Sequence, residues 1–246
     1  SKRYSRKRSI RWGFNMNAPI FSFEGVTGGY GGGIVVNDVS GYVNKGEVLF
    51  VLGRNGVGKS TLLKLLFGYL KLTRGHVRFK GNDIGSKKPE EMSFLGITFC
   101  PQERVVFDNL SVLENLVLMS RNRDVTPFRE YFECFPILAD RLTQDAGTLS
   151  GGERKILSFV RALGEERQLL MLDEPTEGVQ RENIIHIANL ITDRKKSGST
   201  FVIVEQNLDL LEALGDHVLV LDQGRVMLSG RADIVSREDI LQHLGV

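Results

Sequence analysis

The chain has 246 residues, of which 41% are apolar and 25% are charged, and its formal net charge at pH 7 is +2. This length fits one large domain or two small ones, and the composition is that of an ordinary globular protein. The nearly neutral charge argues neither for nor against nucleic-acid binding, and no run approaches the roughly 18 apolar residues of a membrane helix. Two cysteines in a chain of this size predict a reduced, cytosolic protein.

The first residues, SKRYSRKRSIRW, carry six Lys or Arg and no acid. We interpret residues 1–19 as a disordered basic tail. The alternative is an arm that touches anionic lipid or nucleic acid.

After Pro19 the pattern becomes that of a folded domain. Residues 20–24 alternate like a strand, and the glycines around Tyr30 predict a loop before strand-like residues 34–36. The continuous apolar run at residues 47–52 predicts a strand buried on both faces of a parallel sheet. A helix over residues 59–69 and a short strand at residues 76–80 follow.

Residues 104–165 are mostly helical in pattern, and Ile156, Phe159, Val160 and Leu163 mark one face of a helix. Buried strands are expected at residues 169–172 and 201–204, with a helical stripe between them and a hairpin over residues 218–229. Strands that alternate with helices predict an α/β fold with a parallel core sheet.

The segment from Gly53 to Ser60, GRNGVGKS, fits the pattern G-x-x-x-x-G-K-[ST] between a buried strand and a helix. Its glycines allow backbone N–H groups to surround phosphate oxygens, and the helix N-terminus adds partial positive charge. In this position Lys59 can reach the β- and γ-phosphates of a nucleotide, and Ser60 can bind Mg²⁺.

The strand at residues 169–172 ends in two acids, Asp173 and Glu174. Ligands of such sheets lie at the carboxyl ends of the strands. We therefore expect Asp173 to hold Mg²⁺ and Glu174 to orient or deprotonate an attacking water.

The segment Leu149-Ser150-Gly151-Gly152-Glu153 precedes the helix marked by Ile156. Ser150 and Glu153 form an S-x-x-E capping box, which explains both residues structurally. Two consecutive glycines at a helix start are costly unless the backbone must come close to something, so this helix start is also an anion-site candidate.

These three motifs, in this order, resemble the Walker A, signature and Walker B motifs of ABC ATPases. The resemblance extends from about residue 20 to the C-terminus. It implies a RecA-like P-loop NTPase core with a small antiparallel β subdomain and an inserted helical subdomain at about residues 104–165. It also implies head-to-tail pairing of two such domains, in which Ser150 of one subunit faces the ATP held by Lys59 of the other.

The resemblance assigns further residues. Tyr30 lies where the family stacks an aromatic ring on adenine, and Gln102 resembles the glutamine that touches Mg²⁺ and senses the membrane subunit. The residues expected to contact ATP are Tyr30, Gly53, Asn55, Gly56, Gly58, Lys59, Ser60, Thr61, Ser150, Gly151 and Gly152. Those expected to bind Mg²⁺ are Ser60, Gln102 and Asp173, and the catalytic residues are Glu174 and Gln206.

Two positions depart from the usual family pattern. Gln206 replaces the usual histidine after the strand at residues 201–204, and Gln180 replaces the usual aspartate after Glu174. An amide can donate a neutral hydrogen bond but cannot take up a proton.

The segments GRNGVGKST, LDEPTEGVQ and VEQN together resemble the second ATPase subunit of importers for branched-chain amino acids, urea or short amides. The segment LSGGERK is less typical of that group, in which glutamines usually follow the signature glycines.

The resemblance implies a cytoplasmic transport ATPase, peripheral on the inner face of the membrane. Its expected partners are membrane-spanning permease subunits, a second ABC ATPase subunit that is a paralogue or a copy of itself, and indirectly a solute-binding protein, with no nucleic acid. Two alternatives remain open. One is an ATP-gated regulatory module with little hydrolysis, and the other is a soluble ABC ATPase that acts on nucleic acid or ribosomes.

Overall fold

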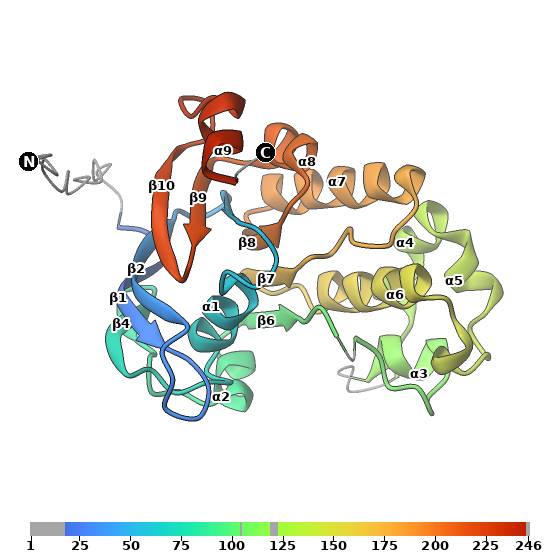
Figure 1. The fold of residues 1–246 in the computed structure, drawn as a ribbon. Coiled ribbons are helices and arrows are strands. Elements are labelled where there is room, and N and C mark those ends of the chain that lie inside the picture. Colours follow the sequence, from blue (N-terminus) through green and yellow to red (C-terminus); the bar gives the residue numbers. More distant parts are fainter. Residues whose placement is uncertain (1–17, 104, 119–122, 245–246) are drawn as a thin grey trace, which may run out of the picture.

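The central sheet of the molecule is mainly parallel, with strand order β10-β9-β3-β8-β7-β6 (Figure 1). Its strands are β3 (Val48–Leu52), β6 (Ile97–Cys100), β7 (Leu169–Asp173), β8 (Thr200–Glu205), β9 (His217–Asp222) and β10 (Arg225–Arg231). β3 pairs in parallel with β8 and β9, β7 pairs in parallel with β6 and β8, and β10 lies antiparallel to β9. Every residue of β3, β7 and β8 is buried, which is why continuous apolar runs mark them in the sequence.

This computed structural model describes residues 18–103, 105–118 and 123–244. The basic tail predicted for residues 1–19 therefore lies almost entirely outside the described residues.

A second, antiparallel sheet has strand order β2-β1-β4-β5. Its strands are β1 (Phe21–Gly28), β2 (Val36–Val43), β4 (Arg74–Phe79) and β5 (Asn82–Asp83). The hairpin of β9 and β10 links the two sheets, because the Asn37 N–H donates a hydrogen bond to the Gly224 carbonyl (2.8 Å). The expected small antiparallel subdomain is thus present beside the parallel core.

Helices surround the sheets and also form a separate lobe, which lies at the right of Figure 1. The helices are α1 (Lys59–Leu66), α2 (Pro89–Phe94), α3 (Val112–Val117), α4 (Arg129–Cys134), α5 (Pro136–Asp140), α6 (Gly151–Gly164), α7 (Arg181–Lys196), α8 (Leu208–Leu214) and α9 (Arg237–Leu244). Short 3₁₀ turns occupy Thr126–Phe128 and Ala146–Thr148. Helices α3 to α6 form this lobe, as expected for the inserted helical subdomain.

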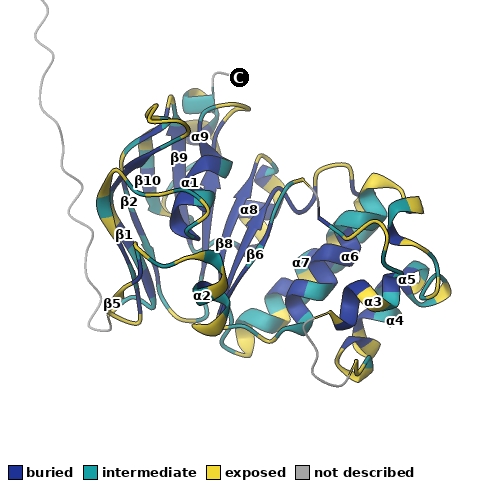
Figure 2. Cartoon of the chain, turned by 90° about the horizontal axis from the view of Figure 1, so that it is seen from below, coloured by how far each residue is buried: buried dark blue, intermediate teal, exposed yellow. Residues whose placement is uncertain are grey.

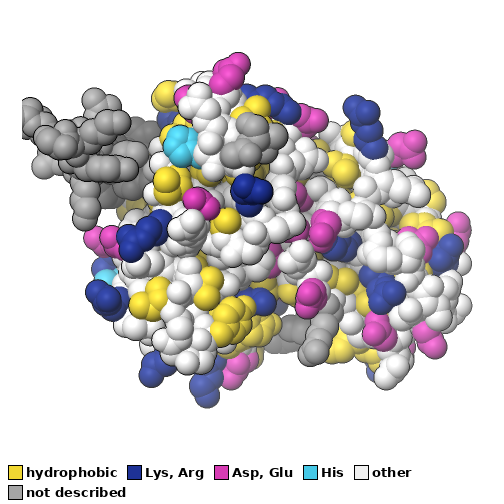
Figure 3. Space-filling view, in the orientation of Figure 1, with side chains coloured by type: hydrophobic (Ala, Val, Ile, Leu, Met, Phe, Trp, Pro, Cys, Tyr) yellow, Lys and Arg dark blue, Asp and Glu magenta, His cyan; other side chains and the backbone are white. Residues whose placement is uncertain are grey.

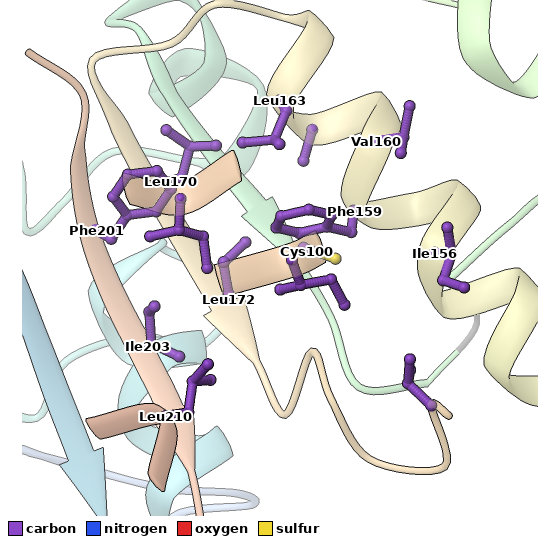
Figure 4. Packing of buried hydrophobic residues seen from close by; sticks show 14 of the residues in the cluster. Cys100, Ile156, Phe159, Val160, Leu163, Leu170, Leu172, Phe201, Ile203 and Leu210 are labelled. Atoms are coloured by element: carbon purple, nitrogen blue, oxygen red, sulfur yellow. The ribbon is translucent and has the colours of Figure 1, made fainter. Parts of the chain in front are cut away.

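Two hydrophobic clusters pack on the opposite faces of the parallel sheet. The residues of β3 alternate between them: Val48, Phe50 and Leu52 belong to one, and Leu49 and Val51 belong to the other. α6 packs on the first cluster, where Phe159 and Leu163 point toward Cys100 and Leu170 (Figure 4), while α1 packs on the second. Each fully buried large apolar side chain stabilises the fold by roughly 1.5–3 kcal/mol. Figure 2 shows the strands buried and the exposed residues gathered at turns and on the outer faces of helices.

Some elements differ from the sequence-based expectation. α1 ends at Leu66 and not at Tyr69, because Gly68 adopts a left-handed φ of 84° and its N–H bonds to the Leu65 carbonyl (3.3 Å). α2, α9 and β5 were not predicted. Within the described ranges, no helix is long and apolar enough to cross a bilayer.

Candidate functional site

The loop between β3 and α1 carries the glycine pattern GRNGVGKS. Gly56 and Gly58 have φ of 80° and 108°, a region that favours glycine. A Cβ on Gly53 would lie 2.6 Å from the Leu221 carbonyl oxygen, so this position also requires glycine. The N-cap of α1 is Gly58, which makes no side-chain cap, so the first N–H groups of the helix are left free for a ligand in the loop. The loop therefore forms a cradle of backbone donors.

Lys59 is almost completely buried at the start of α1, with 4% of its surface exposed. Its Nζ donates hydrogen bonds to the carbonyl oxygens of Gly53 (2.9 Å) and Arg54 (3.1 Å). The same nitrogen lies 3.4 Å from Glu174 Oε1. The phosphate-binding lysine predicted from the sequence thus lies directly between the glycine loop and the acid that follows β7.

Ser60 and Asp173 meet where α1 passes the end of β7. Ser60 Oγ donates a hydrogen bond to Asp173 Oδ1 (3.0 Å). Burial raises the pKa of Asp173 from 3.8 to about 6, and the Ser60 hydrogen bond opposes that rise. A second raising influence on this pKa is the neighbouring charge of Glu174, while Lys64 and Lys59 lower it. These two predicted metal ligands therefore lie in contact.

Glu174 begins the turn after β7 with a φ of 49°, and its N–H bonds to the Val204 carbonyl (2.9 Å). Its Oε1 accepts a hydrogen bond from Gln206 Nε2 (3.1 Å), and its Oε2 accepts one from Gln102 Nε2 (2.8 Å). Both predicted glutamines therefore converge on this carboxylate from the ends of β8 and β6.

Gln206 also donates to Asn55 Oδ1 (2.8 Å), so it links the glycine loop to Glu174. Gln206 does not cap the helix that follows it. The cap of α8 is Asn207, whose Oδ1 accepts from the Leu210 N–H (3.2 Å).

A cavity of about 140 Å³ lies at this point. It is lined by Val35, Asn55, Gly56, Gly58, Lys59, Ser60, Thr61, Gln102 and Glu174. Residues from four separate segments of the sequence thus face one space at the carboxyl edge of the parallel sheet, where such folds bind ligands.

The signature segment lies outside the lining of this cavity. The capping box is present: the Glu153 N–H donates to Ser150 Oγ (3.3 Å), and the Ser150 N–H donates to Glu153 Oε2 (2.8 Å). A Cβ on Gly152 would lie 2.7 Å from the Gly178 carbonyl oxygen, whereas one on Gly151 would meet nothing within 4 Å. Packing inside the chain accounts for the second glycine, and the first faces open space.

Tyr30 lies on the loop between β1 and β2 with 51% of its surface exposed. Its hydroxyl accepts a hydrogen bond from Lys64 Nζ (3.3 Å), and it does not line the cavity. Gln180 is exposed at the start of α7, where its side chain makes no capping hydrogen bond. The structure brings neither residue into contact with Lys59 or Glu174.

Sequence reasoning missed three residues around the site. Glu205 is buried with 4% exposure, and its Oε1 accepts from both the N–H (3.0 Å) and the hydroxyl (2.5 Å) of Thr176. Lys155 and Glu177 form an ion pair of 2.8 Å beside Glu174. The sequence held no local signal for these contacts, because they join residues 22 and 29 positions apart in the chain.

The sequence model of the family described as "ABC transporter" matches residues 36–177, which is more than half of the chain. The chain belongs to the ABC transporter family. The predicted P-loop fold and ATPase activity are thereby confirmed.

Relatives in this ABC family align with most of the chain. It is 36% identical to the high-affinity branched-chain amino acid transport ATP-binding protein BraG of Pseudomonas aeruginosa, covering 85% of this chain and 91% of that protein. It is 35% identical to the probable branched-chain amino acid transport ATP-binding protein LivF of Archaeoglobus fulgidus, covering 85% and 89%. It is also 30% identical to the lipopolysaccharide export system ATP-binding protein LptB of Haemophilus influenzae, covering 89% and 94%. The predicted resemblance to branched-chain amino acid transport ATPases is confirmed.

Solved structures of ABC cassettes have the same fold. The ADP conformation of MJ1267, an ATP-binding cassette of an ABC transporter, is 30% identical with a TM-score of 0.75, covering 93% of this chain and 96% of that one. A nucleotide-free ATP-binding cassette from an ABC transporter is 29% identical with a TM-score of 0.77 and the same coverage.

Proposed function

We propose that this ABC ATPase binds ATP with Mg²⁺ in the cavity around Lys59 and hydrolyses it to energise the import of branched-chain or other hydrophobic amino acids. The observation that carries the ATP site is the convergence of Lys59, Ser60, Asp173 and Glu174 at one edge of the sheet. The similarity to BraG and LivF supports the class of solute.

The residues that line the cavity, together with the adjoining Asp173, fit ATP and Mg²⁺ chemically. The glycine loop offers backbone donors to phosphate oxygens, and Lys59 Nζ can exchange the carbonyls of Gly53 and Arg54 for them. Ser60, Asp173 and Gln102 offer hydroxyl, carboxylate and amide oxygens, the ligands that Mg²⁺ prefers. Among the described residues no three His, Cys, Asp or Glu side chains are grouped so that they could hold a metal ion by themselves.

The chain's own residues have distinct tasks in this proposal. Glu174 accepts the proton of the attacking water, and Gln206 donates a hydrogen bond toward the transferred phosphoryl group. Bound Mg²⁺ would neutralise negative charge on the phosphate oxygens. Gln102 and Gln206 each donate to one Glu174 oxygen, so the two amides hold the carboxylate in place while each oxygen keeps further acceptor capacity.

Two further features support a partner subunit and a permease. Gly151 faces open space at the start of α6, as expected if Ser150, Gly151 and Gly152 approach the ATP of a second ATPase subunit. Large apolar side chains are exposed near α2: Phe94 (91%), Tyr69 (57%) and Leu95 (39%). Figure 3 shows hydrophobic side chains gathered on the face over α1 and α2. Such a patch is suited to contact with a membrane-spanning partner, which in turn would meet a solute-binding protein.

Uptake of radiolabelled leucine, urea and ribose by cells that lack this chain tests the solute. We expect leucine uptake to fall, to return with the wild-type chain and to stay low with Glu174→Gln. Normal leucine uptake with loss of another solute would contradict the amino-acid assignment.

Phosphate release by the wild-type chain, with Glu174→Gln as the blank, separates this proposal from an ATP-gated module with little hydrolysis. Affinity for nucleic acid that falls steeply with salt would favour the alternative of a nucleic-acid ATPase.

A further inference from the structure

Lys155 joins α6 to the turn that carries Glu174. It lies four residues after Gly151 in the helix that begins with the signature glycines. Its Nζ donates a hydrogen bond to the main-chain carbonyl of Glu174 (2.9 Å) and another to Glu177 Oε2 (2.8 Å). One side chain therefore holds two points of the same turn.

Glu177 also receives Gln102 from the loop after β6. Gln102 Nε2 lies 3.1 Å from Glu177 Oε2 and 2.8 Å from Glu174 Oε2. The Glu177 oxygen thus accepts from α6 and from the Gln102 loop, two segments far apart in the sequence. The hydrogen bonds from Lys155 and then Gln102 lower the pKa of Glu177, so the carboxylate is charged at neutral pH.

Burial distinguishes this ion pair from the surface pairs of the molecule. The Lys155 side chain is only 13% exposed, although Glu177 is 56% exposed. Exposed ion pairs contribute little to stability, and Lys87 and Glu91, whose side chains are 42% and 43% exposed, form such a pair. A lysine that is mostly buried needs hydrogen-bond acceptors. Both acceptors of Lys155 belong to the turn that carries Glu174.

The backbone of Glu174 is fixed at both of its peptide groups. Its N–H bonds to Val204 in β8, and its carbonyl oxygen accepts from Lys155 in α6. Its φ of 49° is an unusual conformation for a residue with a side chain, so it requires such support. A shift of α6 relative to β8 would change the direction of the Glu174 carboxylate.

We infer that Lys155 and Glu177 are positioning residues that couple the start of α6 to Glu174 and Gln102. This inference rests on the proposed function, because it deepens the account of the same ATP site. Movement of the signature segment is transmitted through Lys155 to the turn, and Glu177 carries part of that movement to Gln102.

Steady-state kinetics of Lys155→Met, Lys155→Arg, Glu177→Gln and the Lys155→Met/Glu177→Gln double variant test the inference. Methionine keeps the apolar stem but has neither charge nor donors. We expect Lys155→Met to lower kcat on the order of tenfold, as for loss of a charged hydrogen bond, with little change in ATP affinity. Lys155→Arg should recover part of the rate, and the double variant should be no slower than Lys155→Met.

Lys87→Met is the matched control, since it removes a lysine from an exposed ion pair outside the site. Wild-type kcat in Lys155→Met would overturn the inference. A parallel loss of kcat, ATP affinity and melting temperature would also overturn it, because that pattern shows a purely structural role.

Hydrogen exchange supplies a readout that does not need turnover. The amides of residues 174–179 should exchange faster in Lys155→Met than in wild type, and Lys87→Met should leave them unchanged. Unchanged exchange there would count against the inference even if the isolated wild-type chain were inactive. Wild-type failure to release phosphate in transport-competent membranes would instead count against the proposed function, whatever the exchange data show.

Discussion

Gln206 is the residue whose role is most open to direct measurement. Its amide donates to Glu174 Oε1 (3.1 Å) and to Asn55 Oδ1 (2.8 Å), so it touches both the candidate base and the glycine loop. Gln206→Ala should raise the activation free energy of hydrolysis by about 1–3 kcal/mol, seen mostly as a lower kcat, because the Glu174 carboxylate loses a hydrogen-bond partner. Gln206→His should keep activity and gain pH dependence near the ordinary histidine pKa of about 6.5.

The measurement is ATPase activity of wild type and both variants between about pH 5.5 and 8.5. Equal activity of Gln206→Ala and wild type at every pH would show that this amide does not assist the reaction.

The raised pKa of Asp173 predicts that the stability of the protein depends on pH when EDTA is present and nucleotide is absent. Its pKa in the fold is about 6, above the ordinary value of 3.8. A raised pKa favours folding while the group is protonated, so this contribution is present below about pH 4 and is lost as the pH rises through about 6. This contribution of Asp173 to the free energy of unfolding changes by at most about 3 kcal/mol between low and high pH. Asp173→Asn cannot ionise and should gain stability relative to wild type over this range.

Urea unfolding of wild type and Asp173→Asn at about pH 4.5 and 7.5 checks this expectation. Serine at position 60 is retained in both proteins, so its hydrogen bond to the side-chain oxygen is common to them. An identical pH dependence of the two free energies of unfolding would contradict the raised pKa.

At the scale of elements, the two glycines at the start of α6, Gly151 and Gly152, allow a matched pair of variants to be compared. A Cβ on Gly152 would lie 2.7 Å from the Gly178 carbonyl, and overpacking of this kind costs about 1–3 kcal/mol. A Cβ on Gly151 meets nothing in the same chain. We expect Gly152→Ala to lower the melting temperature and Gly151→Ala to leave it unchanged or slightly raised.

ATP-dependent association of subunits distinguishes Gly151→Ala from Gly152→Ala independently of their melting temperatures. Gly151→Ala should weaken it if this surface approaches the nucleotide of a partner subunit. A Gly151→Ala protein with wild-type melting and wild-type association would contradict the proposed contact, and an unchanged melting temperature of Gly152→Ala would contradict the packing argument.

The buried elements were the easiest to predict from the sequence. β3, β7 and β8 are continuous apolar runs, and the spacing of Ile156 and Phe159 marks the buried face of α6. α2 and α9 were missed because each is short and buries a single residue, Met92 or Ile240. Periodicity is not detectable in such elements.

The candidate site was predictable where a motif is contiguous in the sequence. Lys59, Ser60, Asp173 and Glu174 are examples, and the structure places them in contact. The contact of Lys155 with Glu177 was not predictable, because it joins residues 22 positions apart through the packing of α6 against a turn. Tertiary contacts of this kind leave no local pattern.

At the scale of the whole molecule, Glu174→Gln should separate binding from hydrolysis. The lining of the cavity keeps its shape, because glutamine is isosteric with glutamate, but the proton acceptor is lost. We expect ATP binding to persist and ATP-bound subunits to accumulate as a dimer, with the natural partner if self-association is weak. Size-exclusion chromatography with and without Mg-ATP measures this.

Wild type in the same buffer is the control, and it should return to monomer as ATP is consumed. Unimpaired turnover by Glu174→Gln, together with no nucleotide-dependent change in elution, would contradict both the role of Glu174 and the head-to-tail pairing.

The burial of Lys59 has a consequence for the chemical durability of the protein. Acylating and carbamylating reagents need an exposed amine, and only 4% of Lys59 is exposed while its nitrogen is surrounded by the carbonyls of Gly53 and Arg54. Lysines on the surface, such as Lys45 and Lys80, have no such cover. The loop that we propose presents a cation to phosphate therefore also shelters that cation from covalent damage, and we expect the lysine assigned to ATP to be among the last to be modified.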